Sequence, residues 1–408
     1  MSRLSLSPAD RMARNWFVET TKSLGCNVSV DSMGNTFAIR KGRREGTPTC
    51  AGSHLDTQPT GGRYDGILGV CAGVEMLRVL QEQKIETEYP VGVINWTNEE
   101  GARFPISMIA SGVWAGKIPL ERAHSLQEVA GGKQTMKQEL KRIGFLGDME
   151  TTYKAMRIGA HFELHIEQGP RLEAQSQKIG IVHGVQAYRW HTVTVKGRDC
   201  HTGTTDFANR SDAMLTAAKL IVHSHRLATK HSCLASTGIL TLTPGSTNTV
   251  PGTVQFSLDI RAGEDDRLMR LENQLQTDFE KIASNEPVDD LNEGGTIGKG
   301  CSVYWSLDAP SEAINFDEDC IRCVENSTRD LFGDEQGKLS QAMISGAGHD
   351  SVFTSKRVPT SMIFVPCKDG VSHNPEEYCS PEDCANGAQV LMGAVLRYDK
   401  FRGEKAKN

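Results

Sequence analysis

The sequence predicts an α/β protein in which a smaller α/β domain is inserted into a larger one. Three observations support this prediction. The chain has 408 residues, which is long for one ordinary compact domain. Patterns typical of helices and of strands alternate through its first part. The same alternation of patterns returns near the C-terminus, after a segment whose patterns differ. We therefore expect one discontinuous domain, residues 1–187 and 314–408, and an inserted domain, residues 188–313.

The first expected element is a helix close to the N-terminus. Ser7 precedes a proline, and Asp10 follows in the first turn, as in a capped helix start. Met12, Trp16 and Phe17 would form the apolar face of this helix.

Strands and helices then alternate, and the expected strands end on polar side chains. The strands are expected within residues 35–42, 47–54, 89–100 and 161–170, with a helix over residues 70–83. Open α/β sheets build ligand sites in the crevice beyond the carboxyl ends of their strands. Polar residues at these ends therefore indicate a ligand site.

The expected inserted domain has the alternation of apolar and polar residues that is typical of antiparallel strands. Strands are expected within residues 189–198, 236–245 and 248–263, with helices over 209–231 and 265–284. His223, His225 and His231 lie on the first of these helices, where we expect a solvated face and no metal site. The larger domain resumes with a helix over residues 317–332, a strand within 359–366 and a closing helix from Pro381.

The composition excludes several broad classes of protein. The chain is 38% hydrophobic and 24% charged, close to the average of globular domains, which excludes a disordered, collagen-like or coiled-coil chain. The formal charge of −6 comes without a basic stripe, so we expect no nucleic-acid partner. No run approaches the roughly 18 apolar residues of a membrane span. Eleven scattered cysteines favour reduced thiols and a cytoplasmic location.

One histidine and two aspartates surround a glycine-rich turn at the end of the second expected strand. His54 and Asp65 could be metal ligands. The Asp56 carboxylate would then accept a hydrogen bond from the His54 ring nitrogen that does not bind the metal. A core histidine with satisfied hydrogen bonds is the structural alternative for His54.

Further candidate ligands follow other expected strands. Glu99 and Glu100 are adjacent, and adjacent carboxylates repel each other unless a cation lies nearby. A solvated acidic loop is the structural alternative for this pair. With His165 and His373, the carboxylates and imidazoles suit two divalent ions that share one carboxylate, as in metal-assisted hydrolysis.

Six blocks of the sequence resemble those of one protein family. They are GSHLDTQPTGGRYDGILGV, NWTNEEGARF, HFELHIEQGP, CHTGTTDFANRSDA, SGAGHDSVF and VSHNPEEYCSPED. Together, and in this order along nearly the whole chain, they resemble peptidase family M20 in its hydantoinase/carbamoylase branch. The resemblance implies a di-metal catalytic domain, with a mixed sheet flanked by helices, and an inserted lid domain through which two subunits form a homodimer.

The resemblance also implies which residues hold two divalent metal ions. His54 and His165 match ligands of one ion, and Glu100 and His373 match ligands of the other. Asp65 matches the aspartate that bridges both ions. Zinc is the first expectation, with manganese, cobalt or nickel as alternatives.

Other matched residues imply roles in a reaction. Glu99 matches the general base of the family, and Asp56 matches the acid that steadies the first imidazole. His201 matches a histidine that polarises the scissile carbonyl, helps to hold the oxyanion and binds substrate. It is the residue that we most expect to act in trans across the homodimer.

Substrate contacts are implied for three further positions. Asn248 and Arg261 match residues that bind the substrate carboxylate, which suits the planar fork of arginine. Gln168 matches a glutamine that meets the substrate's amide or carboxylate. His349 also lies in a matched block, where it either reaches the site or supports a loop.

The implied activity is that of a metal-dependent amidohydrolase acting on a linear ureido group. Our first expectation is the β-ureidopropionase reaction, from N-carbamoyl-β-alanine to β-alanine, ammonia and carbon dioxide. Hydrolysis of an N-carbamoyl-L-α-amino acid or of allantoate is the alternative. A non-catalytic binding relative would belong to a different class, and it would lack at least one ligand or the base.

Overall fold

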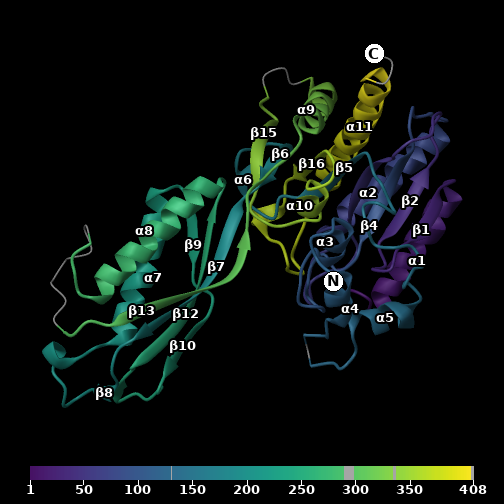
Figure 1. Cartoon of the computed structure of the whole chain (residues 1–408). Coiled ribbons are helices and arrows are strands. Elements are labelled where there is room, and N and C mark those ends of the chain that lie inside the picture. Colours follow the sequence, from purple (N-terminus) through teal and green to yellow (C-terminus); the bar gives the residue numbers. More distant parts are fainter. Residues whose placement is uncertain (130, 289–297, 334–336, 406–408) are drawn as a thin grey trace. The chain divides into compact units, whose positions relative to one another are not determined.

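The structure is a computed structural model that describes residues 1–129, 131–288, 298–333 and 337–405. Its contacts divide into two compact units. The larger unit comprises Met1–Gly184 and Asn315–Asn408, and the smaller unit comprises Val185–Ile314. Figure 1 shows that each unit has its own sheet and its own helices.

A mixed sheet of nine strands forms the centre of the larger unit. The strand order is β1-β2-β4-β3-β5-β16-β6-β14, with β15 paired to β6. The strands are β1 (Asn27–Val30), β2 (Thr36–Arg40), β3 (Thr49–His54), β4 (Val91–Trp96), β5 (Ala160–Ile166), β6 (Ile179–Val185), β14 (Ile314–Asn315), β15 (Ser340–Ser345) and β16 (Thr360–Val365). The neighbours β4, β3, β5 and β16 are parallel, so their carboxyl ends lie along one edge of the sheet.

Helices cover both faces of this sheet. The helices of the larger unit are α1 (Pro8–Ser23), α2 (Ile67–Glu82), α3 (Ile109–Trp114), α4 (Leu120–Ser125), α5 (Met136–Ile143), α6 (Arg171–Ala174), α9 (Glu318–Phe332), α10 (Ser351–Thr354) and α11 (Pro381–Lys405). Helix α2 packs on β3, β4 and β5, and α11 packs on α2, α9 and β16. Gly73 of α2 lies against Ala51 and Val93, whereas the alternate residues Cys50 and Ile94 belong to a core cluster on the opposite face. The expected α/β class, with a mixed sheet flanked by helices, is confirmed.

The N-terminal helix α1 begins as expected but buries a different face. Ser7 is its N-cap, and the Ser7 hydroxyl accepts from the backbone N–H of Asp10. Phe17 is buried, but Met12 and Trp16 are 73% and 42% exposed, so the predicted apolar face is wrong. The buried face carries Asp10 and Arg14, which form an ion pair of 2.7 Å between Nε and Oδ2. Charged groups can be buried when each has a partner, and a hydrophobic pattern does not register such pairs.

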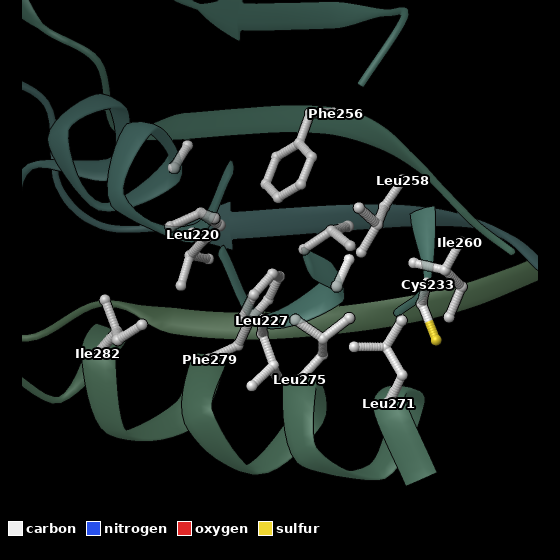
Figure 2. Packing of buried hydrophobic residues seen from close by; sticks show 14 of the residues in the cluster. Leu220, Leu227, Cys233, Phe256, Leu258, Ile260, Leu271, Leu275, Phe279 and Ile282 are labelled. Carbon is white, nitrogen blue, oxygen red and sulfur yellow. The ribbon is translucent and has the colours of Figure 1, made fainter. Parts of the chain in front are cut away.

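The smaller unit has an antiparallel sheet of five strands with two helices against it, and a separate sheet of two short strands, Cys200–His201 and Thr249–Val250. Its strands are β7 (Ala187–Lys196), β8 (Cys200–His201), β9 (Leu234–Ser236), β10 (Leu240–Thr243), β11 (Thr249–Val250), β12 (Thr253–Ala262) and β13 (Ser302–Ser311), and its helices are α7 (Ala213–Lys230) and α8 (Asp265–Ala283). Figure 2 shows Leu271, Leu275 and Phe279 of α8 directed towards Phe256 and Leu258 of β12. This cluster gives the unit a hydrophobic core of its own.

One histidine of α7 is placed differently from the expectation. His223 is buried, and its Nε2 lies 2.8 Å from Oδ2 of Asp278 in α8. The prediction of a solvated position is therefore wrong for His223, whereas His225 is exposed.

Within the described ranges, no helix is long and apolar enough to cross a membrane.

A second buried histidine lies inside the central sheet of the larger unit. His161 on β5 is fully buried, and its Nε2 accepts a hydrogen bond of 3.2 Å from the Trp96 indole N–H. The neighbouring strand carries Gly52 at this level, where a Cβ would overlap the imidazole. Burial disfavours the charged imidazolium and lowers the pKa of His161 to about 3.

The folded protein should therefore lose stability in acid through His161. Below a pH of about 6.5 the unfolded chain binds a proton at this residue and the folded chain does not, so the free energy of unfolding falls as the pH falls towards 3. His161→Gln keeps an acceptor for the Trp96 N–H but cannot be protonated in this range. Urea unfolding at pH 7 and pH 4.5, with chelator present, should show an acid loss about 2 kcal/mol smaller in the variant. An equal loss in both proteins would contradict a neutral His161.

Candidate metal centre

Two groups of possible metal ligands meet at the carboxyl edge of the parallel strands. In the first group, Oδ1 of Asp65 lies 3.4 Å from Nε2 of His54 and 3.1 Å from Nε2 of His165. His54 is the last residue of β3, and His165 lies near the end of β5. All three residues are buried, and their ligand atoms lie within 4.8 Å of one another.

The second group shares Asp65 with the first. Oδ2 of Asp65 lies 3.3 Å from Nε2 of His373, and the same nitrogen lies 3.4 Å from Oε2 of Glu100. Glu100 follows β4, and His373 follows β16. The structure therefore brings together all five residues expected as ligands, with one oxygen of Asp65 facing each group.

The chemistry and geometry of these groups fit divalent ions. Two ligands that each lie about 2.1 Å from one tetrahedral zinc ion are about 3.4 Å apart, as these atoms are. The Nδ1 atoms of His54 and His165 lie 2.9 Å and 2.8 Å from backbone carbonyls, which assigns the hydrogen to Nδ1 and the lone pair to Nε2. Within the described ranges, the buried Nε2 of His54 has no hydrogen-bond partner. A metal ion would use this lone pair.

The pKa values of the acids at the centre are shifted in different directions. Burial raises the pKa of Asp65, but the surrounding imidazoles, His165 first, outweigh it and hold the pKa well below its usual range. Burial raises the pKa of Glu99 well above its usual range, and burial followed by the Asp65 charge raises that of Glu100. A divalent ion would stabilise the ionised form of these clustered carboxylates.

Glu99 lies beside the first group without belonging to either. Its Oε2 is 3.5 Å from Nε2 of His54. Glu99 is buried, so its carboxylate is held next to the ligand atoms and away from bulk water. A carboxylate in this place can move a proton to or from a reacting group.

Asp56 supports the centre by contacts that differ from the expected one. The Nδ1–H of His54 donates to the backbone carbonyl of Asp56, at 2.9 Å, whereas the Asp56 carboxylate is 3.9 Å from that nitrogen. The carboxylate oxygens instead accept from the backbone N–H groups of Glu99 and Glu100, both at 3.3 Å. Asp56 therefore steadies the imidazole through its main chain and the two glutamates through its side chain.

Two glutamines contact the candidate ligands. Nε2 of Gln168 donates to Oδ2 of Asp65 at 2.8 Å, and its buried Oε1 has no hydrogen-bond partner among the described residues. Nε2 of Gln58 donates to Oε2 of Glu100 at 2.8 Å, and the Gln58 backbone N–H donates to Oε1 at 3.2 Å. Gln58 is not among the residues that the sequence indicated for the centre, although it lies within a matched block.

His349 reaches the centre. Its ring is buried, and the ring centroids of His349 and His165 are 4.4 Å apart. Of the two alternatives open for His349, contact with the site is the one observed.

The backbone around the centre is strained or tightly packed at several points. Gln168 and His373 have φ angles of +57° and +55°, which non-glycine residues rarely adopt. Gly66 has a φ of +68°, and a Cβ there would overlap the His54 ring, so only glycine suits this position.

The three substrate-contact candidates of the smaller unit do not form one group. His201 on β8 pairs with Thr249 on β11, next to Asn248. Arg261 lies near the far end of β12, eight residues beyond its first residue, Thr253. That separation is about 26 Å along an extended strand. The Arg261 guanidinium pairs with Asp259 at 2.7 Å.

Comparison with known proteins agrees with this fold. The sequence model of peptidase family M20/M25/M40 matches residues 50–397. The chain belongs to this family of hydrolases. Within the family it lies in the hydantoinase/carbamoylase branch.

Individual relatives match over nearly the whole chain. An N-carbamoyl-L-amino-acid amidohydrolase of Rhizobium meliloti is 38% identical, over 97% of this chain and 90% of the relative. A ureidoglycolate hydrolase of Oryza sativa subsp. japonica is 33% identical, over 97% and 80%. The crystal structure of an amidase of the hydantoinase/carbamoylase family from Burkholderia multivorans has a TM-score of 0.88 and 39% identity, over 97% of this chain and 92% of that one.

The geometry predicts which of two bound ions each ligand substitution removes. Glu100→Ala should reduce the bound zinc or cobalt from about two ions per chain to about one, because only the second group uses Glu100. His54→Ala should remove the other ion, and Asp65→Ala should weaken both. Elemental analysis after dialysis measures the stoichiometry, with the exposed Glu75→Ala as control. Retention of both ions by Asp65→Ala would contradict a shared carboxylate.

Proposed function

We propose that this protein is a metal-dependent amidohydrolase that removes the carbamoyl group from N-carbamoyl-L-α-amino acids. The observation that carries the proposal is the pair of ligand groups sharing Asp65, with Glu99 beside them and outside both. A set of this kind serves metal-assisted hydrolysis with a separate proton carrier. The relatives named above support the ureido class of substrate.

The reaction consumes one water and yields the amino acid, ammonia and carbon dioxide. Two divalent ions would supply Lewis-acid activation of the ureido carbonyl and of the attacking water. Glu99 takes a proton from the water and gives it to the nitrogen of the first C–N bond that breaks. The carbamic acid that remains then loses carbon dioxide, which frees the second nitrogen. His201 stabilises the negative charge that develops on the carbonyl oxygen. Gln168, Asn248 and Arg261 hold the amide and carboxylate of the substrate.

The choice of L-α-amino acid differs from our first expectation. N-carbamoyl-β-alanine has one more methylene between ureide and carboxylate, and the relative with 38% identity is named for N-carbamoyl-L-amino acids. Hydrolysis of a ureidoglycolate-type ureide is the second candidate, supported by the name of the plant relative. Allantoate stays the alternative that the sequence resemblance implies. Zinc as the metal, a homodimer and a cytoplasmic location belong to the same proposal.

A role for His201 in trans is also part of the proposal. Within one copy of the smaller unit, His201 and Asn248 are adjacent, whereas Arg261 lies along the strand from them. His201 and Asn248 lie at β11, which comes just before the first residue of β12, and Arg261 lies near the last residue of β12. A substrate of a few heavy atoms cannot reach from one end of this strand to the other. We therefore assign His201 and Asn248 to one subunit and Arg261 to the other.

Glu99→Gln should separate binding from chemistry. The variant should keep both ions and substrate affinity, because Glu99 belongs to neither ligand group, while kcat falls by about 10²–10⁴-fold. Metal analysis, substrate binding and ammonia release measure the three properties. Glu100→Ala, which removes the adjacent acid, should lose an ion as well as turnover. Near-normal turnover of Glu99→Gln would sink its assignment as the base.

A substrate panel tests the class and the preference together. Ammonia release is measured with N-carbamoyl-L-α-amino acids, their D enantiomers, N-carbamoyl-β-alanine, ureidoglycolate and allantoate, with added zinc or manganese. We expect kcat/KM to be highest for an L-α substrate, by about tenfold or more over N-carbamoyl-β-alanine. Preference for N-carbamoyl-β-alanine would overturn the choice of substrate. No turnover of any ureide by a protein with two bound ions would overturn the activity.

A further inference from the structure

Glu377 is a buried carboxylate that has no role in the proposed reaction. It follows His373 by four residues, in the segment between β16 and α11. Its side chain faces the glycine-rich turn that carries Asp65, and only 1% of the residue surface is exposed. A buried carboxylate needs partners that satisfy its oxygens.

The partners of Glu377 lie on both sides of Asp65. Its Oε1 accepts from the backbone N–H groups of Tyr64 and Asp65, at 2.9 Å and 3.1 Å. Its Oε2 lies 3.0 Å from the Ser372 hydroxyl, which is also 3.0 Å from Oδ2 of Asp65. The hydroxyl has one hydrogen and donates to one of these carboxylates at a time. Glu377 thus contacts the main chain of Asp65 directly and its side chain through Ser372.

The turn leaves space for this carboxylate. Gly62 lies three residues before Asp65, and a Cβ at Gly62 would overlap both the carboxylate and the Cβ of Glu377. The φ angle of Gly62 lies outside the left-handed region, so an alanine is compatible with the φ of this position, and it would collide with Glu377. Gly62 therefore provides a way to displace Glu377 without removing it.

We propose that Glu377 is a positioning residue that fixes Asp65 so that its two oxygens face the two ligand groups. Hydrogen bonds from backbone N–H groups to a carboxylate are charge-assisted and hold the peptide at a defined place. Asp65 serves both groups, so a shift of its backbone disturbs both ions together. The inference rests on the proposed function only in taking Asp65 as a ligand of two ions.

The test compares two substitutions of Glu377 by their affinity for Co²⁺. Glu377→Ala leaves the N–H groups of Tyr64 and Asp65 without an acceptor, and the apparent Kd for both ions should rise about 10–100-fold. In Glu377→Gln one amide oxygen can still accept from both N–H groups, so the Kd should stay within about threefold of wild type. The visible absorption of bound Co²⁺ and competition with a chelator measure the two affinities without any turnover.

Two further variants sharpen the comparison. Gly62→Ala should reproduce the loss of affinity of Glu377→Ala, because it pushes the Glu377 side chain, from its Cβ outward, away from the turn. Glu376→Gln removes the charge of the adjacent exposed acid and should bind both ions as the wild type does. Thermal unfolding of each metal-free variant shows whether the larger unit is folded.

Several outcomes would overturn the role of Glu377. Wild-type Co²⁺ affinity in Glu377→Ala would do so, as would equal losses in the alanine and glutamine variants. Failure of both Glu377→Ala and Gly62→Ala to fold without metal would assign Glu377 to the stability of the unit and not to the metal site. If the wild type binds two ions but hydrolyses no ureide, the proposed function fails, and the Co²⁺ titrations still decide the role of Glu377.

Discussion

The candidate centre depends on one shared carboxylate, Asp65. Three imidazoles converge on it, two from the ends of β3 and β5 and one from the loop after β16, and each of its oxygens faces a different ligand group. A carboxylate in this position cannot be optimised for one group alone, because any rotation that improves one set of distances changes the other. The contacts of Gln168 and Glu377 with Asp65 follow from this constraint. Both contacts are with Asp65 and therefore bear on the orientation of this carboxylate between the two ligand groups.

The convergence of ligands could be predicted from the sequence because it follows from strand direction. The carboxyl ends of β3, β4 and β5 share an edge, so polar residues that end those strands must approach one another. His54, Glu100 and His165 are of this kind. The prediction failed for α1, where the apolar residues Met12 and Trp16 are exposed. The buried face of that helix carries an ion pair, and a pattern of regularly spaced apolar residues does not indicate it.

Supporting contacts were harder to predict because they depend on individual atoms. The sequence indicates a carboxylate at Asp56, but not that its carbonyl meets His54 while its side chain meets two backbone N–H groups. Gln58 donates to the Glu100 carboxylate and Glu377 accepts from the backbone N–H of Asp65, in both cases across long stretches of chain. Residue type and spacing indicate ligands, whereas the partners of backbone groups appear only when the turns are in place. The roles of the site residues in catalysis stay predictions until the variants are measured.

The strand order also dictates when the centre can form as the chain folds. Strand β16 pairs with β5 through residues such as Phe364 and His165, although the whole smaller unit lies between them in the sequence. Pairing over such a separation is slow, and an unpaired β5 edge is exposed to aggregation until β16 arrives. The smaller unit has its own core and can fold before that step. A ribosome must therefore release most of the chain before His373 can meet Asp65, and the metal centre is among the last parts of the molecule to assemble.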